Sequence, residues 1–314
     1  MSVDTRRAEG SFAASTSAGL HALVIGVIGL ALTASIQAGI YIVSGSVALL
    51  ADTLHNGIDL LGTAGVWLAF RLVGRGRSER FTFGYHRFED LAAAFVALLI
   101  AASAILVFWE GIRALIHDSD VYHPWAVLAG GLVGAAGNET VALYKIRVGK
   151  RIGSLALEAD GRHSRADGLT SLAVVVAAVG LLIGQGWMDA AAGLTVGMII
   201  ARSAYITGRD SFLRLLDGSD PELREYLLKR ACDIEQIEHV NDLRVRHSGR
   251  TVHVVASVCM AGSNTLEQAH ETADELRECW SELLPIGSPI DIHVDPYEPG
   301  PEHVDSHHAG IQLD

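Results

Sequence analysis

The stretch HALVIGVIGLALTASIQAGIYIV, residues 21–43, is apolar on every side and long enough to cross a lipid bilayer. A bilayer core about 30 Å thick needs about 20 apolar residues in one helix. A second run of this kind, AAAFVALLIAASAILVFW, occupies residues 92–109. One such run could be a core helix of a soluble protein, but several in succession favour a membrane protein. We therefore predict six membrane-spanning helices, at 20–43, 47–71, 89–115, 124–146, 155–184 and 188–209.

The composition agrees with a membrane protein that carries an acidic tail. Half of the 314 residues are apolar and 19% are charged, whereas an average soluble domain has about 25% charged residues. Residues 1–216 hold 17 Lys and Arg against 16 Asp and Glu, but residues 217–314 hold 7 against 20. So acidic a tail disfavours nucleic acid or anionic lipid as a partner and favours cations.

The positions of Lys and Arg predict the orientation in the membrane, because basic connections stay in the cytoplasm. Basic residues precede the first predicted span, fill the connection 71–90, and follow the sixth span. Lys145, Arg147, Lys150 and Arg151 are assigned to the connection between the fourth and fifth spans. The other three connections contain no Lys or Arg. We expect both termini in the cytoplasm and the protein in the plasma (inner) membrane.

The two ends of the chain carry further expectations. The polar residues 1–20 lead into a full-length apolar stretch, which favours an internal first span over a cleaved signal peptide. Cys232, Cys259 and Cys279 all fall in the acidic tail and form no C-x-x-C pair. An odd number of such cysteines favours reduced thiols in a cytosolic compartment.

The pattern changes after Leu216. Residues 220–237 predict an amphipathic helix, with Asp220 as its cap and Pro221 in its first turn. Two strand-like runs meet at Ser248-Gly249, a second helix starts at Asn264, and the run PIDIHVDP is the last strand. The order αββαβ predicts a small cytosolic two-layer α/β domain of ferredoxin-like type. The predicted organisation is an N-terminal segment 1–19, a six-helix bundle 20–216, this domain at 217–296, and a disordered tail 297–314.

One motif occurs twice inside the predicted spans. The second span contains ALLADTLHNGIDLL, residues 48–61, and the fifth contains ALEADGRHSRADGL, residues 156–169. Both spell Ala-Asp-x-x-His-x-x-x-Asp. A His and an Asp four residues apart lie on one face of a helix, with their Cβ atoms about 5–6 Å apart.

The depth of the two motifs predicts a shared metal site. Both lie about 12–20 Å from the start of their spans at a helical rise of about 1.5 Å, which is near the bilayer midplane. Ionisable groups there need a partner or a function. His55, Asp59, His163 and Asp167 would together offer two nitrogens and two oxygens, a set that suits tetrahedral Zn²⁺. The alternative is two His–Asp hydrogen bonds that only hold the bundle together.

These features resemble the cation diffusion facilitators, a family of transporters for zinc and related metals. The resemblance covers the six spans, both copies of H-x-x-x-D, the αββαβ tail and the F-G-Y-x-R-x-E segment at residues 83–89. It implies that His55, Asp59, His163 and Asp167 form the transported-ion site. It also implies a homodimer, formed through the cytosolic domain, and exchange of metal for protons.

The ligand types suggest the mechanism and the ion. Metal binding needs neutral His and ionised Asp, so protons and metal compete for the site. Paired His and Asp favour Zn²⁺ over Mn²⁺, and leave Co²⁺, Cd²⁺, Ni²⁺ and Fe²⁺ open. We expect no organic cofactor. The competing functions are a membrane-anchored metal sensor and a membrane metalloenzyme, and the chain lacks the H-E-x-x-H motif of zinc proteases.

Other polar residues of the spans have less certain roles. Asp52 and Asp160 either orient the ligands or lie on a proton path, or they are local partners of Arg or the backbone. Glu139 could pair with Lys145 or line the cavity, and neither Glu139 nor Asn138 is expected to bind the metal directly. We expect the side chain of Gln37 to form a hydrogen bond to a neighbouring helix.

Two weaker metal sites are suggested by the resemblance. Some family members hold a second ion between spans two and three, but this chain has Phe81 and Tyr85 where those members have His, so we expect no such site. A regulatory site in the cytosolic domain would use His270, His293 and Asp295, with His253 as a substitute. The alternative is a polar edge of a small domain.

Overall fold

The computed structural model describes residues 3–44, 62–116, 124–185, 187–285 and 287–297. The chain divides into two compact units, each described here by itself. One unit comprises residues 14–212, and the other comprises residues 213–314 together with residues 1–13.

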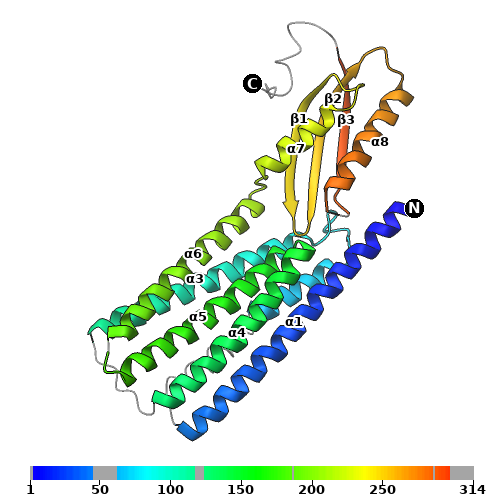
Figure 1. Ribbon diagram of the computed structural model, residues 1–314. Coiled ribbons are helices and arrows are strands. Elements are labelled where there is room, and N and C mark those ends of the chain that lie inside the picture. Colours follow the sequence, from blue (N-terminus) through cyan, green and yellow to red (C-terminus); the bar gives the residue numbers. More distant parts are fainter. Residues whose placement is uncertain (1–2, 45–61, 117–123, 186, 286, 298–314) are drawn as a thin grey trace. The chain divides into compact units, whose positions relative to one another are not determined.

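The first unit is a bundle of long helices (Figure 1). The helices are α1 (Val3–Ser44), Gly62–Val73, α3 (Arg87–Ile116), α4 (Pro124–Ile152), α5 (Leu155–Leu182) and α6 (Trp187–Leu215). Within the described residues, three stretches are long and apolar enough to cross a membrane: Ala14–Ile40, Arg87–Trp109 and Trp125–Ile152. Most of the predicted second span lies outside the described residues.

Two boundaries differ from the sequence prediction. The helix α1 starts at Val3 rather than near residue 20, because Ala, Arg and Glu in this segment favour helix even where the chain is polar. The helix α4 continues to Ile152, past the predicted end at residue 146. Lys145 therefore lies within α4 and is fully buried, which corrects its assignment to the connection between two spans.

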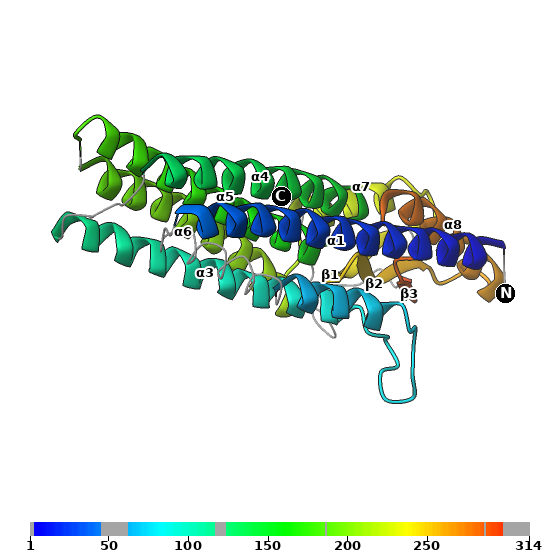
Figure 2. The ribbon, with the colours of Figure 1, turned by 90° about the horizontal axis from the view of Figure 1, so that it is seen from below.

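The helices α4 and α5 form a tight antiparallel hairpin (Figure 2). Gly153 turns the chain with a positive φ of 70°, a conformation that glycine adopts without steric cost. A Cβ atom at Gly149 would lie only 2.8 Å from the backbone nitrogen of Glu158, so the two backbones almost touch there. Glycine therefore sets the spacing between the helices.

The start of α5 is fixed by a capping serine. The Ser154 hydroxyl accepts a hydrogen bond from the Leu157 backbone N–H, at 3.3 Å, and donates one to Glu89 Oε2 on α3, at 3.0 Å. The bundle core around it contains Phe70, Leu157 and Ile200. The cap thus ties α5 to α3 beside the apolar core.

The second unit confirms the predicted αββαβ order. Its elements are α7 (Pro221–Cys232), β1 (His239–Ser248), β2 (Thr251–Ala261), α8 (Leu266–Leu283) and β3 (Ile290–Tyr297). Asp220 caps α7 by accepting a hydrogen bond from the Glu222 N–H, as predicted, and Thr265 caps α8.

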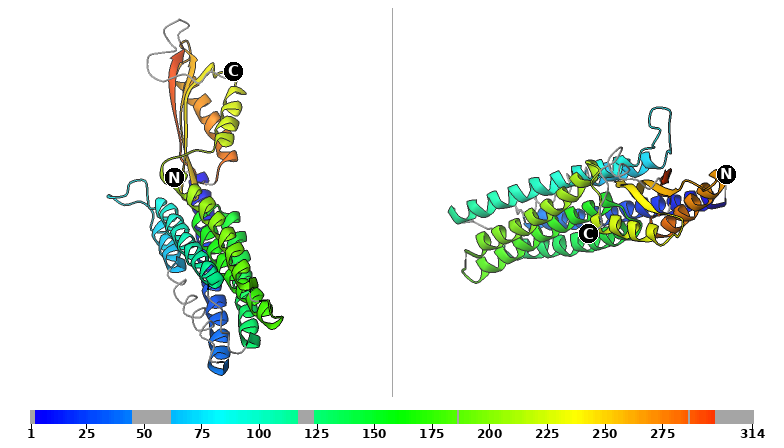
Figure 3. Two further views of the ribbon diagram at one scale, coloured as in Figure 1. Left: turned by 90° about the vertical axis from the view of Figure 1, so that its left-hand side faces the viewer. Right: turned by 90° about the horizontal axis from the view of Figure 1, so that it is seen from above.

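The three strands form one sheet in the order β1-β2-β3, with β1 antiparallel to β2 and β2 parallel to β3. The helices α7 and α8 cover one of its faces (Figure 3). Trp280 of α8 is fully buried in this layer, and its indole N–H donates to the Leu227 carbonyl oxygen of α7 at 3.1 Å. The opposite face carries polar side chains such as Ser257, His293 and Asp295, together with the exposed Val255.

The C-terminal unit includes the last residues of α6, from Leu213 on, and these contact the β1–β2 turn. Arg214 Nη1 donates to the Gly249 carbonyl oxygen at 3.1 Å, and Arg246 lies 3.6 Å from the Asp217 carboxylate. His247 is mostly buried beside them. Burial and the positive charge of Arg214 lower the pKa of His247 to about 4, against a smaller opposing effect of Asp220.

Candidate metal site

His163 and Asp167 form a buried pair on α5. The two side chains are only 3% and 4% exposed, and His163 Nδ1 lies 3.8 Å from Asp167 Oδ1. One helical turn separates the two residues, as the four-residue spacing predicts. A nitrogen and an oxygen thus face the bundle interior from one helix.

The helix Gly62–Val73 packs against this pair. A Cβ atom at Gly62 would lie 3.8 Å from His163 Cδ2, so the imidazole is in contact with the second predicted span. The predicted ligand Asp59 precedes Gly62 by three residues. Asp52, His55 and Asp59 themselves lie outside the described residues, so the structure describes half of the predicted ligand set.

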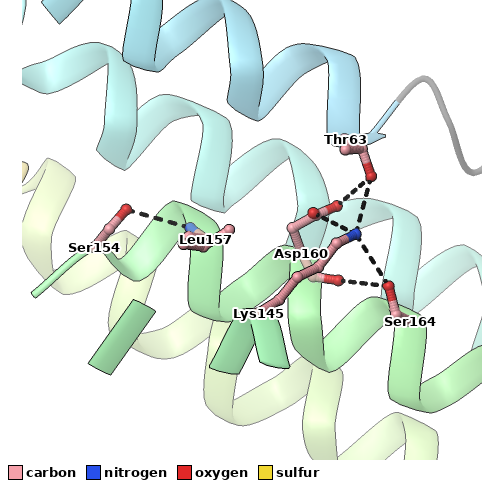
Figure 4. A network of polar contacts seen from close by, with 6 residues as sticks. All are labelled: Thr63, Lys145, Ser154, Leu157, Asp160 and Ser164. Atoms are coloured by element: carbon pink, nitrogen blue, oxygen red, sulfur yellow. Dashed lines mark hydrogen bonds and ion pairs between the residues drawn. The ribbon is translucent and has the colours of Figure 1, made fainter. Parts of the chain in front are cut away.

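A network of polar side chains joins α4, α5 and the helix Gly62–Val73 (Figure 4). Lys145 Nζ of α4 is 2.7 Å from Asp160 Oδ2 of α5, and both side chains are at most 1% exposed. Thr63 Oγ1 donates to Asp160 Oδ1 at 2.9 Å. Lys145 also donates to Thr63 Oγ1 and Ser164 Oγ, at 3.2 and 3.3 Å. The partner of Asp160 is therefore a lysine from another helix, not an arginine.

Glu139 pairs with Arg165 rather than with Lys145. Arg165 reaches from α5 to Glu139 on α4 and donates two hydrogen bonds, at 2.9 and 3.1 Å. Both side chains are roughly half-buried. The alternative that Glu139 pairs with Lys145 is wrong, because Lys145 lies six residues further along α4 and meets Asp160 instead.

Further polar groups lie on α4 and α1. Asn138 is 1% exposed, and its amide oxygen and nitrogen have no hydrogen-bond partner among the described residues. Gln37 of α1 donates to the Gly130 carbonyl oxygen of α4 at 3.3 Å, in agreement with the predicted hydrogen bond between helices. The bundle interior therefore carries buried polar side chains on α1 and α4 as well as on α5.

The segment before α3 contains an aromatic cluster. The rings of Phe81 and Tyr85 lie 4.7 Å apart between centroids, and Phe88 contacts both rings. The Tyr85 hydroxyl is 3.1 Å from Ser78 Oγ. These side chains therefore hold the segment by ring packing.

In the C-terminal domain, His293 and Asp295 meet on the polar face of β3. His293 Nε2 lies 3.0 Å from Asp295 Oδ1. Ser257 and Asn241 donate to Asp295 Oδ2, at 2.5 and 3.4 Å. Burial tends to raise the pKa of Asp295, but the Ser257 bond, the charge of His293 and the Asn241 bond together lower it below the usual value.

His270 and His253 do not join this pair. His270 is 72% exposed on α8, where its ring lies 3.5 Å from Asp274. Since α8 packs on the face of the sheet formed by Ile290, Ile292 and Val294, the alternating residues His293 and Asp295 point away from it. Within the described part of the chain, no group of three or more His, Cys, Asp and Glu side chains is placed to hold a metal ion.

Comparison with known proteins agrees with this architecture. Residues 23–216 match the family described as the cation efflux transmembrane domain, and residues 219–297 match the cation efflux protein cytoplasmic domain. The chain belongs to the cation diffusion facilitator family. It is therefore an integral membrane protein of a family of cation efflux transporters.

Individual relatives of this cation diffusion facilitator come from several organisms. A probable cation efflux system protein of Mycobacterium tuberculosis is 41% identical over 91% of this chain and 86% of its own length. Metal tolerance protein C1 of Arabidopsis thaliana is 24% identical over 80% of this chain and 57% of its own. Magnetosome protein MamB of Paramagnetospirillum magneticum is 28% identical over 81% and 86%.

Sequence reasoning missed the partners that cross between helices. Lys145, Thr63 and Arg165 all contact residues of the repeated motif or of α4, but none is one of the Asp or His residues that define the motif. One signal was present in the sequence. Gly149 and Gly161 flank the hairpin turn, and such small residues let two helices approach closely enough for a lysine to reach the facing carboxylate.

Proposed function

We propose that this cation diffusion facilitator exports divalent metal ions, Zn²⁺ foremost, in exchange for protons. His55, Asp59, His163 and Asp167 would bind the ion. The observation that carries the proposal is the buried His163–Asp167 pair. His163 contacts the helix Gly62–Val73, which begins three residues after Asp59. Two imidazoles and two carboxylates fill a tetrahedral shell and suit Zn²⁺.

The exchange with protons follows from the ligand chemistry. Zn²⁺ requires a neutral imidazole and an ionised carboxylate, so loading the ion releases protons and protonation releases the ion. Imidazole titrates in the physiological range, with an ordinary pKa of about 6.5. A site that opens alternately to each side of the membrane would therefore couple efflux of metal to influx of protons.

The orientation and assembly are part of the same proposal. The basic side chains at the ends of α4 and α6 support a cytoplasmic location of both chain termini. The match of residues 219–297 to a cytoplasmic domain agrees with this orientation. We propose six spans and a homodimer held through the C-terminal domain.

Flux measurements test the function. The full-length protein is reconstituted into liposomes that contain a zinc-sensitive dye, and a pH gradient is imposed. We expect Zn²⁺ flux that collapses when a protonophore removes the gradient. His163→Ala and Asp167→Asn should each abolish the flux, because each removes one of four ligands.

A matched control separates ligand loss from general damage. His239→Ala removes an exposed imidazole at the start of β1 and should leave flux unchanged. Thermal melting in detergent should be similar for all folded variants. Flux that persists in both ligand variants would refute the site, and wild-type protein that binds Zn²⁺ without flux would favour a sensor.

A further inference from the structure

Lys145 and Asp160 form a buried ion pair that lies among hydroxyl groups. The lysine ammonium has three protons, and its three neighbours are Asp160 Oδ2, Thr63 Oγ1 and Ser164 Oγ (Figure 4). The other carboxylate oxygen, Asp160 Oδ1, accepts the Thr63 hydroxyl proton. The carboxylate is therefore held on both oxygens by residues of two other helices.

The position of Asp160 places this carboxylate beside the proposed ligands. Asp160 precedes His163 by three residues and Asp167 by seven, so the three side chains follow one stripe of α5. Side chains three apart on a helix have Cβ atoms about 5–6 Å apart. Without a competing partner, Asp160 would be within reach of an ion bound by His163.

The bundle makes room for the lysine on two sides. A Cβ atom at Gly26 of α1 would lie 2.5 Å from Lys145 Cε. A Cβ atom at Gly161 of α5 would lie 3.0 Å from Lys145 Cβ. Because these distances are at or below the usual closest approach of a Cβ atom, both glycines leave space that the lysine side chain occupies.

We propose that Lys145 is a specificity-determining residue that keeps Asp160 out of the coordination shell of the transported ion. The inference rests on the proposed function of the His163 site. With Asp160 held by Lys145 and Thr63, the ion meets two imidazoles and two carboxylates. A released Asp160 would add a third carboxylate, and such oxygen-rich, higher-coordinate sites favour harder ions such as Mn²⁺ over Zn²⁺.

The test compares Zn²⁺ and Mn²⁺ in matched variants of the full-length protein. Equilibrium binding of each metal is measured in detergent, and KM and the maximal flux of each are measured in liposomes. Lys145→Met releases Asp160 and should lower the preference for Zn²⁺ over Mn²⁺ about tenfold, the usual scale for residues that support metal ligands. The double variant Lys145→Met/Asp160→Asn removes the third carboxylate and should return the preference to within about twofold of wild type.

Two further variants keep the outcome decisive. Thr63→Val removes one restraint on Asp160 and should shift the preference in the same direction by a smaller factor, and it decides the matter if Lys145→Met fails to fold. Lys229→Met removes a lysine from an exposed ion pair on α7 and should change nothing.

The results distinguish the inference from its alternatives. If the single variants melt at lower temperature but keep the wild-type metal preference, the pair is only structural and the inference is wrong. If the wild-type protein carries no flux, the proposed transport is refuted, and the binding preferences of the same variants still decide whether Lys145 sets the choice of metal.

Discussion

Arg165 on α5 and Glu139 on α4 form a two-point ion pair, with Arg165 Nη2 2.9 Å from Glu139 Oε1 and Arg165 Nε 3.1 Å from Oε2. Arg165 lies two residues from both His163 and Asp167 in the chain. Glu139 therefore balances a positive charge that lies two positions along α5 from each proposed ligand.

This balance predicts the effect of removing Glu139. Glu139→Gln leaves the guanidinium charge uncompensated, and its repulsion of a divalent cation should raise KM for Zn²⁺ about two- to fivefold, the range of a half-exposed pair. The double variant Glu139→Gln/Arg165→Gln should restore KM. Zinc flux into liposomes measures both, and an unchanged KM in the single variant would contradict the prediction.

The cap of α5 predicts a loss of stability. Ser154→Ala removes the hydroxyl that accepts from the Leu157 N–H and donates to the buried Glu89 carboxylate. We expect a cost of about 1–2 kcal/mol, measured as a lower melting temperature in detergent. Ser281→Ala removes an exposed hydroxyl of α8 that bonds within its own helix, and it should melt like wild type. Equal melting of both variants would argue against the cap.

The close approach of α4 and α5 predicts a difference between two glycines. Gly149→Ala would bring a methyl group to 2.8 Å from the Glu158 backbone nitrogen, so the helices must separate. This overpacking should cost about 1–3 kcal/mol. Gly208→Ala on α6 meets nothing within 4 Å and should be neutral or slightly stabilising. Chemical unfolding in detergent compares the two, and similar effects would refute the close contact.

The lowered pKa of His247 predicts that the C-terminal domain loses stability against unfolding in mild acid. Its pKa is about 4 in the folded protein and 6.5 ordinarily, so between these values the unfolded chain binds a proton that the folded chain does not. The stabilisation is therefore complete above about pH 6.5 and is lost as the pH falls toward 4.

Hydrogen exchange of the full-length protein tests this pH dependence. After correction for intrinsic rates, amides of residues 239–261 should be less protected at pH 5 than at pH 7.5. His247→Gln should flatten the difference, whereas His239→Gln, at an exposed position, should leave it unchanged. Equal protection of the wild type at both pH values would show that His247 does not titrate as inferred.

The sequence predicted elements better than it predicted their contacts. Hydropathy located the helical segments, and the alternation of strand residues with Asp220 as a cap located the C-terminal domain, because these signals are local in the chain. The end of α4 was misplaced because charged residues such as Lys145 look like a connection. The ion pair with Asp160 makes burial of that charge tolerable, and Gly26 and Gly161 leave space for the side chain.

The candidate site likewise combines a local feature, which the sequence predicted, with tertiary contacts, which it did not. The spacing of His163 and Asp167 predicted that they share a helix face, and the structure places them together. The pairing of Asp160 with Lys145 depends on the register between two helices, which spacing within one helix does not contain. The suggested regulatory site also depended on tertiary structure, since α8 places His270 across the sheet from His293.

The two glycines that surround Lys145 also limit how the bundle can move. A shift of α1 or α5 by one residue along α4 would push a side chain into the space that the lysine occupies. One side chain thus fixes the register of the three helices, and we expect them to move as a rigid body. The motion that exchanges ions between the two sides of the membrane must then occur where this rigid body meets the remaining helices.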